Sequence, residues 1–182
     1  MKKEIGETRI VFVFDRFVVK IARIRPVKAV KKILSFGTEY LSVGSSVFLE
    51  YLIGGLIGNI FEQVSYLSLH KILRSRLSPT CFCFFGFINI AKKVSEIPRS
   101  YNLDQAILRS HIYSFIKYYK IPGKLFDTHT FVKLENYGFY KNKLVLLDYG
   151  NPWMYELFHK FPNEMKLFFQ VLEEILKKRR KR

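Results

Sequence analysis

Residues 133–150, KLENYGFYKNKLVLLDYG, decide how we interpret the fold of the whole chain. Two short apolar runs flank a Lys-Asn-Lys turn, which is typical of a β-hairpin running from Asn136 to Leu147. Asn136 stands at one end of this hairpin, and Asp148 follows the other end, just before a Tyr-Gly pair. Amide and carboxylate oxygens are ligands of hard cations, so the two side chains are candidates for one Mg²⁺ site. The alternative is that both are ordinary turn residues.

The composition describes a folded and strongly basic protein. Its 182 residues, 49% apolar and 16% aromatic, are enough for one domain with a core and argue against disorder. With 31 Lys and Arg against 15 Asp and Glu, the formal charge is +16, which predicts a phosphate-rich partner or an anionic membrane surface. Two cysteines one residue apart fit neither a disulfide scaffold nor a metal framework. We therefore expect a cytoplasmic protein, in a bacterium or in the host cell of a phage.

The amino-terminal half predicts strands followed by helices. Residues 7–23 are dense in Val, Ile and Phe around a polar Asp-Arg pair, which indicates two strands joined by a tight turn. A basic helix is expected from Pro26 onward. A further helix is predicted over residues 59–76, with Asn59 as its cap and Glu62 three residues later, as in a capping box.

The segment between these two helices allows two interpretations. Residues 41–61, LSVGSSVFLEYLIGGLIGNIF, are as long as a membrane-spanning helix. However, Glu50 would lie near the centre of the span, where a charge is costly. A buried helical hairpin broken at Gly54 and Gly55 is the favoured alternative.

The carboxyl-terminal half predicts two strands and then mainly helices. Residues 80–90 read as two short strands that meet near Gly86. Apolar residues at helical spacing indicate a helix from Asp104 to about residue 119, and another from residue 162 onward follows the hairpin. Residues 177–182, KKRRKR, form a basic tail.

Three segments resemble the catalytic core of the protein kinase-like superfamily. Residues 148–150, DYG, resemble the Asp-Phe-Gly motif, whose Asp holds Mg²⁺, and residues 18–22, VVKIA, resemble the strand whose Lys pairs with nucleotide phosphates. Residues 129–136, HTFVKLEN, are similar to the catalytic loop His-Arg-Asp-Leu-Lys-x-x-Asn. The order of the predicted elements agrees, so the resemblance covers roughly residues 7–150.

The resemblance implies an α+β, two-lobed protein kinase-like fold formed by residues 1–182 as a single domain. A small β-rich N-lobe is expected over about residues 1–91, with a helical insertion over about 26–58. A truncated helical C-lobe is expected over about residues 92–176, before the basic tail. ATP and Mg²⁺ are the implied cofactors.

The resemblance also assigns roles to individual residues. Lys20 would hold the nucleotide phosphates, while Asn136 and Asp148 would hold Mg²⁺. Glu62 or Glu39 would orient Lys20, and Glu62 is favoured because it lies on the stronger helix. Glu39 is nearer to Lys20 in the sequence.

The catalytic base depends on the register of the catalytic loop. In the ungapped register Phe131 occupies the position of the catalytic Asp, and a phenyl ring cannot take a proton from a hydroxyl group. A second register uses Asp127-Thr128-His129 as the Asp-x-His of aminoglycoside- and lipid-kinase-like relatives, with about four extra residues before Asn136. Asp127 would then be the base.

Three functions follow from these patterns. The first is a kinase-like protein that binds ATP-Mg and transfers a phosphoryl group to a hydroxyl of a protein or small molecule. The second is a catalytically inactive, pseudokinase-like module that binds a protein or nucleic acid through its basic surface and tail; it is favoured by Phe131, by the lack of a Gly-rich loop beyond Gly6, and by the short segment after Gly150. The third is a basic membrane-associated protein built around residues 41–61.

Overall fold

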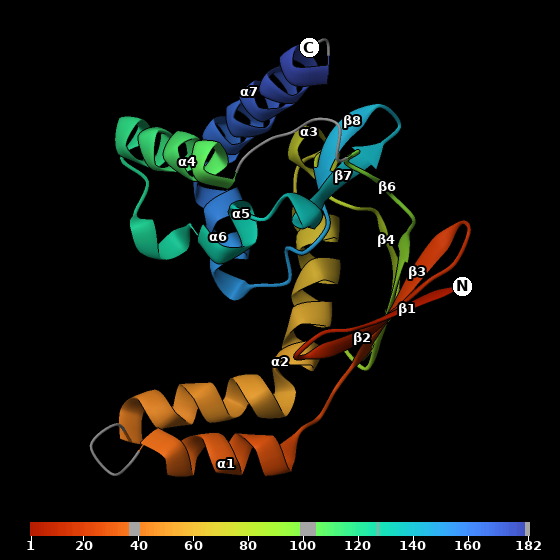
Figure 1. Cartoon of the computed structure of the whole chain (residues 1–182), viewed down its shortest axis with the longest axis vertical. Helices are drawn as coiled ribbons and strands as arrows, with labels where there is room; N and C mark the ends of the chain where they lie inside the picture. Colours follow the sequence, from red (N-terminus) through yellow and green to blue (C-terminus); the bar gives the residue numbers. More distant parts are fainter. Residues whose placement is uncertain (37–40, 99–104, 127, 181–182) are drawn as a thin grey trace. The chain divides into compact units, whose positions relative to one another are not determined.

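The computed structural model describes residues 1–36, 41–98, 105–126 and 128–180, which form a mixed α+β structure with antiparallel sheets (Figure 1). The chain divides into two compact units. The first unit comprises residues 1–63 and 80–93, and the second comprises residues 64–79 and 94–182. Residues 64–79, which the expected N-lobe included, therefore belong to the second unit.

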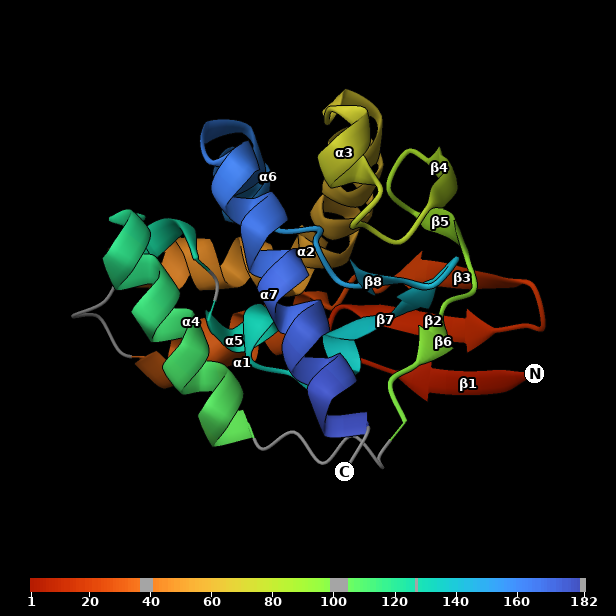
Figure 2. The same ribbon diagram turned by 90° about the horizontal axis from the view of Figure 1, so that it is seen from above.

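The first unit is built on a five-stranded antiparallel sheet in the order β1-β2-β3-β5-β4 (Figure 2). Its strands are β1 (Lys2–Ile5), β2 (Arg9–Val13), β3 (Phe17–Ala22), β4 (Thr80–Phe84) and β5 (Ile88–Lys92). The two predicted strand pairs, β2–β3 and β4–β5, are present. Strand β1 was not predicted, because its four residues, KKEI, are all exposed and show no apolar alternation.

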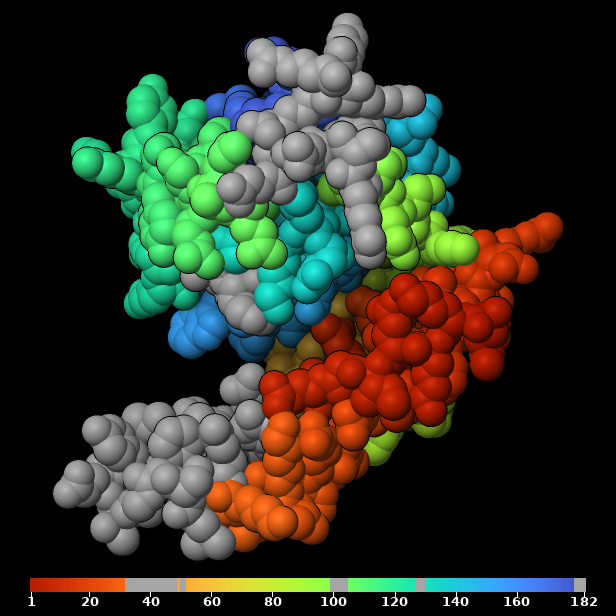
Figure 3. Space-filling view, in the orientation of Figure 1, coloured from red at the N-terminus to blue at the C-terminus, as the bar shows by residue number. Residues whose placement is uncertain are grey.

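Helix α1 (Pro26–Phe36) begins at the predicted proline and follows β3 directly. The Lys28 ammonium pairs with the Glu7 carboxylate, and the Arg25 guanidinium donates to the Glu7 carbonyl at 3.1 Å. Figure 3 shows the start of α1, in orange, against the red residues of the amino-terminal strands. These contacts attach α1 to the β1–β2 turn.

Helix α2 runs without interruption from Leu41 to Ser68, so the predicted break at Gly54 and Gly55 is wrong. The predicted helix start at Asn59 is also wrong, because that residue lies inside α2. A Cβ atom on Gly55 would stand 2.2 Å from the Thr8 carbonyl oxygen, so this glycine allows the helix to approach the strands closely. Among the described residues, no helix is long and apolar enough to cross a membrane.

The second unit contains a three-stranded antiparallel sheet, β6-β7-β8, and several helices. Its elements are α3 (Lys71–Arg74), β6 (Ser95–Glu96), α4 (Gln105–Tyr119), the 3-10 turn η3 (Gly123–Leu125), α5 (Thr128–Phe131), the 3-10 turn η4 (Leu134–Asn136), β7 (Tyr137–Tyr140), β8 (Lys143–Leu146), α6 (Pro152–Lys160) and α7 (Pro162–Arg180). The predicted hairpin is β7–β8. The basic tail is not a separate segment, since residues 177–180 are the last turn of α7.

The core of the second unit is rich in aromatic rings. Phe168 on α7 is completely buried and lies edge-on to Phe115 of α4, to Phe126 and to Phe131, with ring centroids 5.3 to 5.7 Å apart. Helix α6 was not predicted, although Asn151 caps it and Pro152 occupies its first turn. The aromatic core fixes α4, α5 and α7 around the hairpin.

Replacing Gly55 by Ala is expected to lower the free energy of unfolding by about 1–3 kcal/mol, because the new methyl group would displace α2 from the Thr8 carbonyl. In an ordinary helix the same change stabilises by about 1 kcal/mol, so the sign of the effect is diagnostic. Urea unfolding of the purified variant measures it. Gly123→Ala is the matched control, since a Cβ atom there meets nothing within 4 Å. A more stable Gly55→Ala protein would contradict the close approach.

Candidate functional site

Glu62 is the centre of a buried polar cluster in the first unit. Helix α2 places its carboxylate, which is 1% exposed, over the sheet, where it accepts hydrogen bonds from three neighbouring strands. The Lys20 ammonium on β3 lies 2.7 Å from both carboxylate oxygens. The Arg9 guanidinium on β2 lies at 2.6 Å, and the Asn89 amide on β5 at 2.9 Å. Of the two acids considered as partners of Lys20, Glu62 makes the contact, and Glu39 lies outside the described residues.

The strand register explains why these side chains meet. Lys20 is directly opposite Val11 on β2 and Asn89 on β5. Directly opposed residues point to the same face of a sheet, and so does Arg9, two residues before Val11. One face of the sheet therefore presents two cations and an amide to α2.

Asn59 fixes the helix above this face. It is completely buried, and its side-chain amide donates to the Gly86 carbonyl in the β4–β5 turn at 2.8 Å. It lies three residues before Glu62, one helical turn away on the same side of α2. The pair that resembled a capping box thus faces the sheet from the middle of a helix.

Glu62 holds two cations of the first unit in place. The side chains of Lys20 and Arg9, which are 12% and 13% exposed, both contact its carboxylate. A buried charge is tolerated only when it is paired and hydrogen-bonded, and Glu62 meets both conditions. Lys and Arg are also the side chains that bind phosphate groups in proteins.

The charge of the Glu62 carboxylate also affects the pKa of Cys83 on β4. Its thiol donates to the Asn59 carbonyl at 3.6 Å. Burial raises the pKa of Cys83, a hydrogen bond from the Gly86 backbone lowers it, and the negative charge of Glu62 raises it again, with a net upward shift. This upward shift of the pKa favours the thiol over the thiolate. Cys83 and the exposed Cys81 are both free thiols.

Asn136 and Asp148 lie at one end of the β7–β8 hairpin, as predicted. The last paired residues of the hairpin are Tyr137 and Leu146, and one step further the Leu147 amide donates to the Asn136 carbonyl at 2.7 Å. The side-chain nitrogen of Asn136 donates to the Thr130 carbonyl at 2.9 Å, which orients the side chain and makes its Oδ1 atom the one suited to a cation. Asp148 is half-buried and comes immediately after Leu147.

Tyr149 anchors the segment that carries Asp148. Its ring is completely buried in the core, and its hydroxyl donates to the Ser78 carbonyl at 2.6 Å. A Phe at this position would fill the same space without needing a partner for the hydroxyl. Tyr149 therefore holds the backbone beside Asp148 in one place.

Phe131 is a core residue. It is completely buried, its ring centroid lies 4.2 Å from that of Phe126, and its carbonyl accepts a hydrogen bond from the Tyr137 hydroxyl at 3.0 Å. The Phe131 side chain therefore packs in the core of the second unit. Asp127, the candidate base of the second register, lies outside the described residues.

The donor set of the hairpin fits magnesium better than a transition metal. Within the described part of the chain, no group of three or more His, Cys, Asp or Glu side chains could hold a metal ion by itself. Mg²⁺ does not need such a group, because it is bound in proteins by one or two carboxylates together with substrate phosphates and water. An amide oxygen from Asn136 and a carboxylate from Asp148 meet that requirement.

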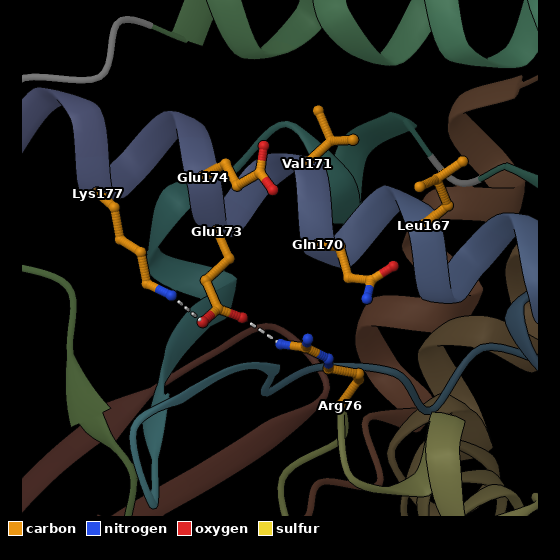
Figure 4. Close-up of a pocket in the computed structure, with 7 residues that line it drawn as sticks. All are labelled: Arg76, Leu167, Gln170, Val171, Glu173, Glu174 and Lys177. Atoms are coloured by element: carbon orange, nitrogen blue, oxygen red, sulfur yellow. Dashed lines mark hydrogen bonds and ion pairs between the residues drawn. The ribbon is translucent and has the colours of Figure 1, made fainter.

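A groove of about 460 Å³ in the second unit lies along α7, away from the predicted residues (Figure 4). Glu173 is its main charged group, and it accepts hydrogen bonds from Arg76 and, at 2.8 Å, from Lys177. Burial would raise the pKa of Glu173, but the hydrogen bonds and charges of Lys177 and Arg76 outweigh it and lower the pKa. Because Arg76 also reaches the Leu144 carbonyl at 3.5 Å, this ion pair joins α7 to β8.

Two members of the Glu62 cluster were not predicted. Arg9 opens an apolar strand and Asn89 interrupts another, FINI, so each is a polar residue in a segment that otherwise reads as buried. A polar residue in an apolar segment can be recognised from the sequence as unusual. The sequence does not show that Arg9 and Asn89 contact the same carboxylate, because that contact depends on the order of the strands in the sheet.

Replacing Glu62 by Ala is expected to lower the free energy of unfolding by about 3–5 kcal/mol, because Arg9, Lys20 and Asn89 would lose the buried carboxylate that they share. Lys20→Met should cost less, about 1.5–3 kcal/mol, since Glu62 keeps its bonds to Arg9 and Asn89. Chemical denaturation of both variants measures which of them loses more free energy of unfolding. Equal losses would mean that Lys20 alone neutralises the carboxylate.

Glu173→Gln is expected to destabilise the protein at pH 7 by on the order of 1 kcal/mol. The pKa of Glu173 is lowered in the folded state, so the carboxylate contributes stability above its unfolded-state pKa and loses it as the pH falls through the folded-state value. The difference between variant and wild type should therefore vanish on acidification. Glu174→Gln, at the exposed neighbouring position, is the control for a general effect of charge. A difference that persists at acid pH would contradict the ion-pair explanation.

A comparison of the chain with known protein families, curated proteins and solved structures finds no match.

Proposed function

We propose that this chain is a kinase-like protein that binds ATP together with Mg²⁺. The observation that carries the proposal is the bidentate contact of Lys20 with Glu62, at 2.7 Å to both carboxylate oxygens. In protein kinases a Lys on a strand is held by a Glu of a helix, and this pair positions the nucleotide phosphates. In this chain the Lys is on β3 and the Glu on α2, the second helix after that strand. The sequence resemblance indicates Lys20, and it favours Glu62 over Glu39 as its partner.

Lys20 would contact the phosphates with its position fixed by Glu62. A lysine side chain has many rotamers, and the paired carboxylate removes this freedom before a ligand arrives. Arg9 shares the carboxylate at 2.6 Å, so Glu62 keeps an ion pair when Lys20 turns toward a phosphate. The three side chains thus hold one another in position.

Asn136 and Asp148 would hold the metal ion. Bound Mg²⁺ would neutralise charge on the phosphates, which is the main requirement of phosphoryl transfer. The Asn136 amide is oriented by the Thr130 carbonyl, and the backbone next to Asp148 is fixed by the buried Tyr149. Both ligands are thus supported by contacts of their own before a metal binds.

The reaction supported best is phosphoryl transfer to a hydroxyl of a protein or small molecule. In this step Asp127 would take the hydroxyl proton, the hydroxyl oxygen would form a bond to the γ-phosphorus, and the bond to the β-phosphate oxygen would break to give ADP. Phe131, which is buried in the core, cannot itself take a proton, so an active protein would use Asp127 as the base. Most of the rate acceleration would come from positioning and charge neutralisation.

A thermal-shift titration with ATP, with and without Mg²⁺, tests the binding proposal. A ligand at 100 times its Kd stabilises the native state by about 2.7 kcal/mol, which corresponds to a rise in Tm of about 5 °C or more for a chain of this size. We expect a shift that requires Mg²⁺, is lost in Asp148→Asn and is reduced in Lys20→Met. Lys92→Met, at the far end of β5, is the matched control and should keep the full shift.

Two outcomes would contradict the proposal. One is the absence of any shift with ATP and Mg²⁺ in the wild-type protein. The other is an equal shift in wild type and Asp148→Asn, which would place the nucleotide elsewhere.

A second candidate function is a catalytically inactive module with the same fold that binds a protein or nucleic acid through its basic surface. It is favoured by the β1–β2 turn, residues 6–8, where the Gly6 amide donates to the Arg9 carbonyl and the Gly6 carbonyl accepts from Arg23. This short turn is not a Gly-rich loop whose amides cradle phosphates. The absence of a nucleotide-dependent shift would favour this candidate.

A further inference from the structure

One end of the first unit's sheet brings together three segments that are far apart in the sequence. Arg9, at the start of β2, is opposite Ala22 at the end of β3, and Ile21 is opposite Ile88 at the start of β5. The Ala22 amide donates to the Phe87 carbonyl at 2.9 Å. The β1–β2 turn, the segment from β3 into α1 and the β4–β5 turn therefore lie at the same end.

The β4–β5 turn exposes three phenylalanines. Phe84, Phe85 and Phe87 are 50%, 77% and 47% exposed, respectively. The Phe87 amide donates to the Phe84 carbonyl at 2.9 Å, with φ of 45° at Phe85 and 79° at Gly86, as in a type I′ turn. Such turns prefer Asn-Gly, and a bulky side chain at positive φ is strained. The positive φ of Phe85 strains its backbone, and its exposed ring gains nothing from burial.

Gly86 explains why the turn projects its phenylalanines. A Cβ atom there would stand 2.7 Å from the Leu56 carbonyl oxygen and 3.1 Å from the Ile60 side chain. The backbone of the turn therefore rests on α2, and the neighbouring side chains extend away from this contact. Strain and exposed apolar area that serve no internal packing mark an interaction site.

Aliphatic and cationic side chains accompany the aromatic turn. Ile24, Val27 and Val30, in and before α1, are 49–67% exposed. A groove of about 470 Å³ is lined by Ile24, Arg25, Pro26, Val27, Lys28 and Lys31. Glu7, in the β1–β2 turn, pairs with Lys28, one of the cations that line this groove. We call Phe84, Phe85, Phe87, Ile24, Val27, Arg25, Lys28 and Lys31 the aromatic–basic end.

We propose that the aromatic–basic end docks on the surface of an anionic membrane. Apolar side chains beside Lys and Arg are the composition by which a protein segment enters the lipid interface while its cations meet the head groups. Charge complementarity favours anionic lipid for a chain with a net charge of +16. This contact requires no spanning helix and is independent of nucleotide binding.

A membrane suits this end better than a nucleic acid does. Single-stranded nucleic acids stack their bases on the faces of aromatic rings. The Phe84 and Phe85 rings instead meet edge to face, with centroids 5.0 Å apart and planes at 75°. Exposed Val27 and Val30 offer no stacking surface. Aliphatic side chains gain from burial in lipid, and this end presents several of them.

Co-sedimentation of the full chain with vesicles tests the proposal. Vesicles of phosphatidylglycerol and phosphatidylcholine should bind the wild-type protein, and vesicles of phosphatidylcholine alone should bind it more weakly. Phe85→Asn creates the preferred Asn-Gly turn, so it should keep or raise Tm while it lowers vesicle affinity about ten-fold. A loss of binding can therefore not be attributed to unfolding. Tyr118→Asn removes a ring that is 78% exposed on α4 and should leave binding unchanged.

The cations are tested by a charge-matched pair of variants. Lys28→Gln with Lys31→Gln should weaken binding to the anionic vesicles by about five-fold per cation. Lys92→Gln with Lys93→Gln removes the same charge at the carboxyl-terminal end of β5, which is the opposite end of the sheet, and should have a smaller effect.

Four results would overturn the proposal. They are no binding of the wild-type protein to anionic vesicles, equal binding of wild type and Phe85→Asn, equal losses from the two lysine pairs, and binding of a single-stranded oligonucleotide that Phe85→Asn abolishes while vesicle binding is unaffected.

Discussion

The burial of the Glu62 carboxylate is the constraint on which the first unit depends. A carboxylate that is 1% exposed must be neutralised, and the chain does this with Lys20, Arg9 and Asn89 from three adjacent strands. Helix α2 therefore has to run directly over the sheet at this point. Glycines at residues 55 and 86 make that approach sterically possible. The ion pairs of Glu62 therefore form only if α2 packs closely on the sheet.

Much of the secondary structure could be predicted because its signals are local. Pro26 starts α1, the polar pair after Phe14 separates two strands, and Gly86 lies in the turn between β4 and β5. The sequence-based predictions were wrong or incomplete where the conformation of a residue depends on a contact with a part of the chain that is distant in sequence. Gly55 indicates a break when only the sequence is considered, but the Thr8 carbonyl requires a glycine there within a continuous helix. Strand β1 is defined by pairing alone and has no apolar pattern of its own.

The candidate site shows the same division. Lys20, Glu62, Asn136 and Asp148 could be proposed because each sits in a segment that resembles a known motif, and the structure brings them together in two pairs, one in each unit. Arg9 and Asn89 could not be proposed, because their roles arise from strand order and register. The spacing of Asn59 and Glu62 fits a helix cap and a sheet-facing polar pair equally well, and only the position of β3 distinguishes the two.

The placement of the Glu62 cluster along the chain has a consequence for synthesis. Arg9, Lys20, Glu62 and Asn89, like every residue of the first unit, lie within the first 93 residues. On a ribosome, which makes the amino-terminal part first, these groups emerge before residues 94–182 are complete. The carboxylate can therefore find its partners while most of the second unit is still unmade. The nascent chain need not hold a buried, uncompensated charge during the remainder of translation.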